Sequence, residues 1–206
     1  MTHPLWLPSA PLALASKSAI RAKVLTDAGL PVEALPAEIE EREVEAGLTG
    51  DGATPANVAG ALAAAKAVDV SLRLPGRLVV GADQTLALDG ERFTKPVDRD
   101  AGRRQLQRLS GRTHTLSSGV ALALDGVALW TDVAEARLTM RALSDAFIES
   151  YLDAAGEGAR LSVGGYQFEG VGAHLFEAVD GDFFTILGLP LLPLLAALRR
   201  AKAVAA

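Results

Sequence analysis

The sequence predicts a mixed α/β fold, with a central mixed sheet and flanking helices in two lobes around a cleft. Three observations lead to this fold class. Apolar runs of strand length, typical of strands buried on both faces, occur at residues 12–15, 78–80 and 85–88. Segments with helical caps and stop signals alternate with such runs, as at residues 55–72. Asp-Gly pairs between apolar runs, such as Asp125-Gly126, indicate hairpins.

Local signals set the ends of the predicted elements. Thr54-Pro55 is a good N-cap and first-turn pair, Asp98 and Ser144 are N-cap residues, and Gly29 is a stop signal. We predict helices at residues 19–28, 55–72, 98–109, 144–154 and 188–200, and strands at residues 30–35, 78–80, 85–88, 116–124, 127–133, 135–141, 175–179 and 183–187.

The composition limits the classes of function. With 206 residues, of which 50% are hydrophobic and 22% charged, the chain can bury one good core, or a core with a smaller lobe. The net charge of -5 argues against a nucleic-acid partner, so a phosphate ligand must meet a local basic cluster. The absence of cysteine excludes disulfides, thiolate zinc sites and a cysteine nucleophile. His3, His114 and His174 are too scattered to suggest a metal site.

Two apolar stretches need to be distinguished from targeting or membrane segments. Residues 5–15 end like a signal-peptidase site, but no Lys or Arg precedes them and prolines interrupt them. Residues 186–198 are too short to span a bilayer, and they contain Pro190 and Pro193. We therefore expect a cytoplasmic protein without a membrane partner.

A strand-to-helix turn at residues 16–21 carries hydroxyl and basic side chains. Ser16 and Ser18 precede or begin the first predicted helix, and Arg21 lies on its first turn. The free amides and the dipole of a helix N-terminus favour an anion, and a guanidinium can bind two phosphate oxygens at once. From this stretch alone, an ordinary N-cap with solvated basic residues explains the pattern equally well.

Two further polar positions interrupt apolar segments. Asp83 follows a buried apolar run, and open α/β sheets place ligands at the ends of such strands. Lys66 is the one basic residue of the alanine-rich segment at residues 55–72. Its aliphatic stem can lie along apolar surface with the ammonium in water, or the ammonium can bind a phosphate. The acidic residues 38–43 suggest a solvated face unless a metal is bound.

The order and spacing of several short motifs resemble the Maf family, the septum-formation Maf-like nucleoside triphosphate pyrophosphatases. The resemblance covers nearly the whole chain, so residues 1–206 are expected to form a single domain of this type. The motifs are Leu14-Ala15-Ser16-Lys17-Ser18 with Arg21, Ile39-Glu40-Glu41, Lys66-Ala67, Gly81-Ala82-Asp83, Lys95-Pro96, Leu109-Ser110-Gly111-Arg112 with His114, Gly164-Gly165-Tyr166, Glu169-Gly170 and Gly188-Leu189-Pro190-Leu191.

The resemblance implies a house-cleaning hydrolase that converts a nucleoside triphosphate to the monophosphate and pyrophosphate in a nucleotide-binding cleft, supported by a divalent metal, Mg²⁺ or Mn²⁺. It implies Glu41 and Asp83 as metal ligands, and Asp83 as the acid/base that orients or deprotonates water. Arg21, Lys66 and Lys95, with Ser16 and Ser18, would bind the phosphates. His114 is expected to be structural, and a homodimer is a possible assembly.

The resemblance also implies that Ile20, Gln84 and Glu169 sort base preference. Asp83-Gln84 and Glu169-Gly170 resemble the 7-methyl-GTP branch, although Ile20 stands where that branch has tryptophan. A carboxylate can accept from both N1–H and the exocyclic amine of guanine, whereas uracil offers one donor. Gln167 is an alternative base reader if the loop register is shifted.

Three other functions compete with this one. They are a dTTP/UTP pyrophosphatase of the same family, a nucleotide-binding regulator of septum formation with little turnover, and a hydrolase of inosine or xanthosine triphosphates. Intact Glu41, Asp83, Lys66 and Lys95 argue against a pure binder, which has no need of both carboxylates.

Overall fold

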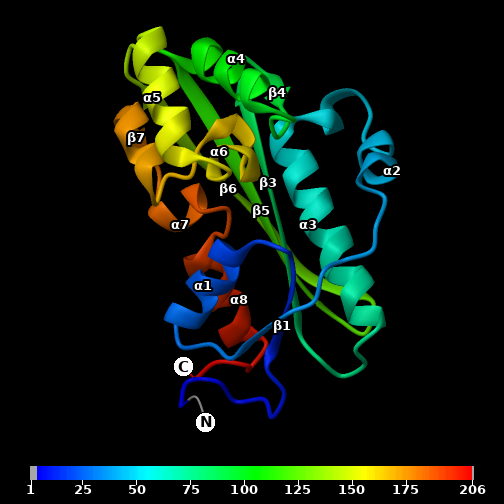
Figure 1. Ribbon diagram of the computed structural model, residues 1–206. Coiled ribbons are helices and arrows are strands. Elements are labelled where there is room, and N and C mark those ends of the chain that lie inside the picture. Colours follow the sequence, from blue (N-terminus) through cyan, green and yellow to red (C-terminus); the bar gives the residue numbers. More distant parts are fainter. Residues whose placement is uncertain (1–3, 206) are drawn as a thin grey trace. The chain divides into compact units, whose positions relative to one another are not determined.

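The computed structural model describes residues 4–205 (Figure 1), so His3 lies outside the described residues. The helices are α1 (Ala19–Asp27), α2 (Glu41–Ala46), α3 (Pro55–Leu72), α4 (Arg99–Leu109), α5 (Asp145–Ala155), α6 (Gly158–Leu161), α7 (Phe183–Ile186) and α8 (Leu191–Arg200), with the 3₁₀ turns η1 (Gly50–Ala53), η2 (Val163–Gly165) and η3 (Val171–Leu175). The strands are β1 (Leu12–Ala15), β2 (Val32–Ala34), β3 (Val79–Leu88), β4 (Glu91–Phe93), β5 (Thr113–Leu124), β6 (Val127–Met140) and β7 (Phe176–Asp180).

One mixed sheet is central to the fold. Among the described residues its strand order is β2-β1-β3-β5-β6-β7, and β4 pairs with β3. β1 pairs in parallel with β2 and β3, whereas β4 is antiparallel to β3 and β7 is antiparallel to β6. The predicted mixed α/β class with a central mixed sheet and flanking helices is therefore confirmed. The arrangement of two lobes around a cleft stays a prediction.

The chain divides into two compact units. Unit 1 takes the residues up to Gln84, then Ser118–Ala134, and the residues from Gly188 onward. Unit 2 takes Thr85–Ser117 and Glu135–Leu187. Strands β3, β5 and β6 pass from one unit into the other along the chain.

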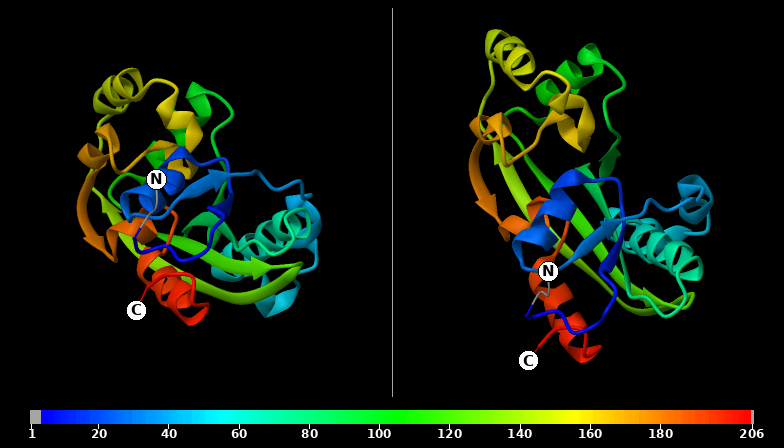
Figure 2. Two further views of the ribbon diagram at one scale, coloured as in Figure 1. Left: turned by 90° about the horizontal axis from the view of Figure 1, so that it is seen from below. Right: turned by 60° about the horizontal axis from the view of Figure 1, so that its bottom comes forward.

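In unit 1 the alanine-rich helix α3 lies directly on the sheet (Figures 1 and 2). A methyl group on Gly119 of β5 would lie 2.2 Å from the carbonyl oxygen of Ala59, and one on Gly81 of β3 would lie 2.0 Å from that of Ala63. Ala59 and Ala63 stand one helical turn apart on the same helix face. Small residues on both elements thus allow helix backbone to contact strand backbone, which fixes where α3 sits.

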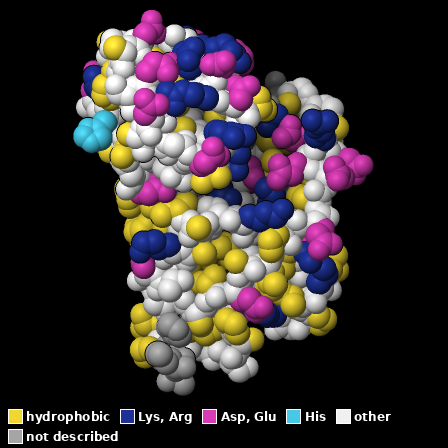
Figure 3. Space-filling model, in the orientation of Figure 1, with side chains coloured by type: hydrophobic (Ala, Val, Ile, Leu, Met, Phe, Trp, Pro, Cys, Tyr) yellow, Lys and Arg dark blue, Asp and Glu magenta, His cyan; other side chains and the backbone are white. Residues whose placement is uncertain are grey.

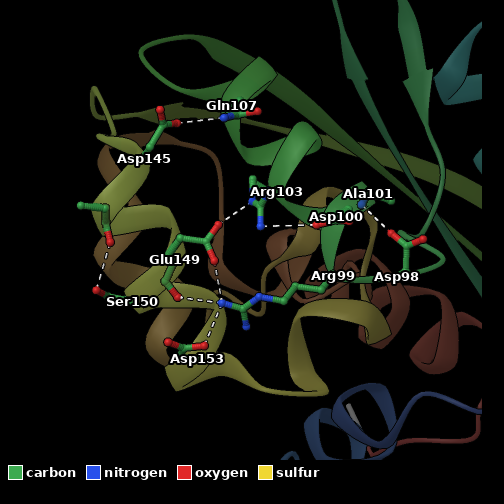
Figure 4. Close-up of polar contacts among 11 residues, drawn as sticks. Asp98, Arg99, Asp100, Ala101, Arg103, Gln107, Asp145, Glu149, Ser150 and Asp153 are labelled. Carbon is green, nitrogen blue, oxygen red and sulfur yellow. Dashed lines mark hydrogen bonds and ion pairs between the residues drawn. The ribbon is translucent and has the colours of Figure 1, made fainter.

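Unit 2 has its own apolar core, with helices α4 and α5 joined by ion pairs at the surface. Leu106 and Leu109 of α4 and Ile148 of α5 are buried in that core. Figure 4 shows Arg99 bound to Glu149 and Asp153, both at 2.8 Å, on the exposed side. Figure 3 shows acidic and basic side chains side by side over these helices. Exposed ion pairs contribute little each, so the buried leucines carry most of this packing.

Several predicted elements and caps are confirmed. The predicted helix at residues 55–72 is α3, and the Oγ1 atom of its N-cap Thr54 accepts from the amide of Asn57. Asp98 and Ser144 cap α4 and α5 in the same way. Asp89-Gly90 joins β3 to β4 with positive φ at both residues, as a tight turn requires.

Two predicted breaks within strands are wrong, and so is one predicted strand. Residues 78–88 do not break at Gly81 but form the single strand β3, since Gly81 provides room for α3 and not a bend. Residues 127–133 and 135–141 are likewise one strand, β6. Residues 183–187 were expected as a strand but contain the helix α7, because the carboxylate of Asp182 accepts from the amides of Phe184 and Thr185 at the helix start.

Among the described residues, we find no helix with both the length and the apolar character needed to cross a membrane.

Candidate active site

The turn between β1 and α1 is closed by its own serines. Ser16 is buried at the end of β1, and its Oγ accepts from the backbone N–H of Ser18 at 3.2 Å. Ser18 is the N-cap of α1, and its Oγ accepts from the amide of Arg21 at 3.4 Å. Both hydroxyls therefore satisfy backbone amides that would otherwise lack partners. Ile20 is half-buried on the first turn of α1.

Arg21 connects this turn to β3. Its Nη1 donates to the carbonyl oxygen of Ala82 at 2.7 Å and to Ser16 Oγ at 3.2 Å. Burial lowers the pKa of Arg21 from its usual value, while the charges of Asp83 and Glu41 act in the opposite direction. The guanidinium thus sits in a desolvated place, where the charges of Asp83 and Glu41 favour its charged form.

Lys66 is held between two carboxylates. Its Nζ lies 2.5 Å from Asp83 Oδ1 and 2.6 Å from Glu41 Oε1. The side chains of Lys66 and Asp83 are 14% and 15% exposed, whereas that of Glu41 is 53% exposed. The contact joins the middle of α3, the centre of β3 and the first turn of α2. We refer to Glu41, Lys66 and Asp83 as the carboxylate–lysine triad.

The close packing of α3 on β3 explains why the triad forms. Alternate residues of a strand share one face, so Asp83 lies on the same face of β3 as Gly81. A methyl group on Gly81 would be 2.7 Å from the backbone nitrogen of Ala67, the residue after Lys66. Asp83 is therefore not at a strand end, as the sequence suggested, but inside β3, and the ammonium of Lys66 compensates its charge.

The triad fits a divalent cation in the donor atoms that it offers. Two carboxylates already converge on one positive charge within 2.6 Å. Mg²⁺ is commonly bound by one or two carboxylates together with substrate phosphates and water, and not by a complete protein cage. Among the described residues, no group of three or more His, Cys, Asp or Glu side chains could hold a metal by itself. A metal at this place would need further oxygen ligands besides these two carboxylates.

Gln84 and Gly188 extend the site in ways that the sequence did not indicate. The Nε2 atom of Gln84 donates to Ser118 Oγ on β5 at 2.9 Å. A methyl group on Gly188 would lie 3.1 Å from both Nε and Nη2 of Arg21, and 3.4 Å from Gln84 Oε1. Gly188 thus leaves room for the Arg21 guanidinium. Its place in a short Gly-Leu-Pro motif was the only signal, and nothing in the sequence pointed to Ser118.

Lys95 and Glu169 belong to unit 2, while every other predicted site residue belongs to unit 1. Both side chains are exposed. Near Lys95 in the chain, residues including Pro96, Gly102 and Leu152 line a pocket of about 410 Å³. Its arginines are already engaged: Arg99 binds Glu149, and Arg160 binds Glu157 at 3.3 Å.

His114 is a buried structural residue, as its residue type and place suggested. It is 1% exposed, and its Nε2 lies 2.7 Å from the hydroxyl of Tyr166. Burial lowers its pKa to about 4, so the ring is neutral at pH 7.

Family membership follows from comparison with known proteins. The family model for Maf-like protein matches residues 11–201, and the chain belongs to this family. A protein named 7-methyl-GTP pyrophosphatase from Brucella abortus is 55% identical over 94% of this chain and 97% of its own. A protein named nucleoside triphosphate pyrophosphatase from Rhodopseudomonas palustris is 53% identical over 98% of each chain.

Similarity to solved structures is much weaker. A HAM1 protein from Coxiella burnetii matches 63% of this chain and 72% of its own, at 14% identity and a TM-score of 0.41. A likeness at this level carries no argument about function.

Proposed function

We propose that the chain is a nucleoside triphosphate pyrophosphatase, with 7-methyl-GTP or a related modified nucleotide as substrate. The observation that carries the proposal is the carboxylate–lysine triad together with the Arg21 turn. Its carboxylates can bind a metal and orient water, and its cations can bind phosphates. Relatives more than half identical over nearly the whole chain bear the names of such enzymes. Residues 1–206 then act as one functional domain.

The basic side chains and the N-terminus of α1 bind the phosphates of the substrate. Arg21 already lies between Ser16 Oγ and the carbonyl of Ala82, so its guanidinium is oriented before substrate arrives. Lys66 and, from unit 2, Lys95 add charge to meet a ligand with about four negative charges in a protein of net charge -5. Local cations are needed because the overall charge of the protein repels the substrate.

The reaction is a displacement at the α-phosphorus. Asp83 Oδ1 is held by Lys66, which leaves Oδ2 to orient a water molecule and take its proton. The water oxygen forms a bond to the α-phosphorus, the bond from that phosphorus to the bridging oxygen breaks, and pyrophosphate leaves against the lysines. The products are the nucleoside monophosphate and pyrophosphate.

Glu41 and Asp83 would hold the divalent metal, Mg²⁺ or Mn²⁺. When bound, such an ion supplies charge neutralisation of the phosphate oxygens and a fixed orientation for them. The ammonium of Lys66 lies within 2.6 Å of both carboxylates, so it limits their mutual repulsion when no metal is bound.

Base recognition is assigned to Glu169, Ile20 and Gln84, the three positions that the family resemblance implies. A carboxylate accepts from two adjacent donors on guanine, and a 7-methylated guanine is cationic, which an acidic group favours. The half-buried Gln167 packs its Oε1 against Gly158, where a methyl group would be 3.1 Å away, whereas Glu169 is exposed. This difference favours Glu169 over Gln167 as the base reader.

The experiment that tests the function is release of pyrophosphate across a panel of 7-methyl-GTP, GTP, UTP, dTTP, ITP and XTP, with Mg²⁺ and with a chelator. We expect pyrophosphate from 7-methyl-GTP with Mg²⁺ and none with the chelator. Release of orthophosphate alone, or no turnover of any nucleotide that binds, would contradict the pyrophosphatase proposal. A preference for UTP or dTTP would overturn only the base assignment.

Glu169→Gln tests the base reader. The amide presents one acceptor and one donor, so one guanine contact becomes donor against donor, and an unpaired polar group costs about 1–3 kcal/mol. We expect the ratio of kcat/KM for 7-methyl-GTP over UTP to fall about 5- to 150-fold. Uracil has no second donor at that edge, so UTP serves as the internal control, and an unchanged ratio would rule out Glu169.

The assembly and the cellular location are part of the same proposal. The possible homodimer and the cytoplasmic location remain predictions, the first of which sedimentation velocity on the purified chain tests directly.

A further inference from the structure

The turn that carries Glu169 is held by contacts on both sides. The amide of Gly170 donates to the carbonyl oxygen of Gln167 at 3.2 Å, which places Glu169 at the third position of a β-turn. Beneath it, a methyl group on Gly172 would lie 2.3 Å from that same carbonyl oxygen. Phe168 packs against Phe176 with ring centroids 5.4 Å apart. The exposed carboxylate thus stands on a turn that has little room to move.

Buried polar groups fix the chain immediately before this turn. His114 Nε2 lies 2.7 Å from the hydroxyl of Tyr166, and Tyr151 donates its hydroxyl to the carbonyl oxygen of Gly165 at 3.0 Å. The His114, Tyr151 and Tyr166 side chains are all buried. Within the described residues His114 Nδ1 has no hydrogen-bond partner, so the contact of Nε2 with the Tyr166 hydroxyl is the one hydrogen bond of this ring.

The backbone at Gly164 and Gly165, just before Tyr166, adopts a conformation that few residues other than glycine adopt. Gly164 and Gly165 have φ values of +81° and +78°, and a methyl group on Gly164 would lie 2.8 Å from the Tyr166 ring. The Tyr166 ring also packs against Phe176, with centroids 4.9 Å apart. A left-handed pair of glycines supplies no rigidity of its own, so neighbouring groups, among them the hydroxyls of Tyr151 and Tyr166, hold the path of the chain.

We propose that Tyr166 and Tyr151, with His114, are positioning residues that set base selectivity through Glu169. The inference rests on the proposed function of Glu169 and adds to it a mechanism. Two acceptors on one carboxylate match two guanine donors only if the carboxylate is held in place. Loss of an anchoring hydroxyl therefore affects guanine recognition more than uracil recognition, which needs one contact.

The test is Tyr166→Phe, which keeps the ring and removes the hydroxyl, with Tyr151→Phe as an independent second variant. The matched control is Ser117→Ala, which removes a buried hydroxyl that donates to Glu135 Oε1 at 2.8 Å elsewhere in unit 2. We expect each tyrosine variant to lower the kcat/KM ratio of 7-methyl-GTP over UTP about 2- to 12-fold. The control should leave the ratio unchanged.

A double variant separates positioning from general destabilisation. In a Glu169→Gln background, Tyr166→Phe should no longer change the ratio, because its effect passes through Glu169. An equal fall in both backgrounds, or an equal fall in Ser117→Ala, would overturn the proposal.

Hydrogen exchange makes the outcome independent of catalysis. The amide of Gly170 should exchange about 2- to 12-fold faster in Tyr166→Phe than in the wild type or in Ser117→Ala. If no nucleotide is turned over, the proposed function fails while this measurement still decides whether Tyr166 holds the turn. Unchanged exchange at Gly170 would overturn the positioning role even in an active enzyme.

Discussion

At the scale of single residues, the ammonium of Lys66 is held by two carboxylates at once. Asp83 is its more buried partner, and Glu41 is about half exposed. Because exposed pairs are weakened by solvent, the contact with Asp83 contributes more to holding Lys66. Asp83 thus has a structural contact at Oδ1 and a proposed chemical role at Oδ2, and a substitution can separate the two.

Asp83→Asn is expected to remove turnover and to keep the fold. The amide oxygen of asparagine still accepts from Lys66 but cannot take a proton from water or bind a divalent metal comparably. A general base contributes on the order of 10²–10⁴-fold, so pyrophosphate release should fall at least by that order. Circular dichroism and titration with the nucleotide serve as controls, and a rate above about a tenth of wild type would contradict the role.

At the scale of elements, the contact of α3 with the sheet determines the site. Gly119 on β5 faces the backbone of Ala59, just as Gly81 on β3 faces that of Ala63. The position of α3 along these strands sets how far Lys66 lies from Asp83. Packing of this one helix is therefore coupled to the contact between Lys66 and Asp83.

Gly119→Ala tests this coupling without altering a polar group of the site. The added methyl group would lie 2.2 Å from the carbonyl oxygen of Ala59, so the helix must shift. Overpacking of this kind costs about 1–3 kcal/mol, and we expect a loss of at least that size in the free energy of unfolding, together with a fall in kcat. Chemical denaturation and steady-state kinetics measure the two effects.

Gly52→Ala is the matched control, because a methyl group there meets no atom within 4 Å. It should change neither quantity. Equal behaviour of the two variants would show that α3 is not held against the sheet as described.

At the scale of the whole molecule, stability depends on pH through proton binding in the folded and unfolded chains. Burial lowers the pKa of His114 from 6.5 to about 4 in the folded protein. Between these values the unfolded chain binds more protons, so stability is lost as pH falls through 6.5 towards 4. Above pH 6.5 both states are neutral at this residue and His114 contributes no pH dependence.

His114→Gln should remove this part of the acid sensitivity. In the wild type, protonation of His114 in the unfolded chain lowers the free energy of unfolding by about 2 kcal/mol at pH 5 and by about 3 kcal/mol below pH 4. We expect the difference in unfolding free energy between pH 7 and pH 5 to shrink by about 2 kcal/mol in the variant, measured by urea denaturation. His174→Gln, at an exposed histidine, is the control. An identical pH dependence in wild type and His114→Gln would refute the assignment.

Local features of this protein could be predicted from the amino-acid sequence alone. Thr54, Asp98 and Ser144 were identified as caps because a hydroxyl or carboxylate at a helix start binds amides a few residues away. The strand-to-helix turn with Ser16 and Arg21 was also visible, since its parts are contiguous. Motif order over the whole chain was enough to indicate the Maf family, which comparison confirms. The catalytic, metal-binding and substrate-binding roles of all the predicted site residues remain predictions.

The pairings between segments far apart in the chain are visible in the three-dimensional fold and not in the sequence. The sequence predicts two strands separated by residues 81–84, but Gly81 is a contact point for α3 inside one continuous strand. Lys66 was ambiguous, and its two carboxylate partners lie on α2 and β3. Local sequence sets backbone preferences and caps over a few residues. The charged side chains that contact one another depend on how closely a helix packs on the sheet. The distance between helix and sheet is set here by glycine and alanine residues far apart in the chain.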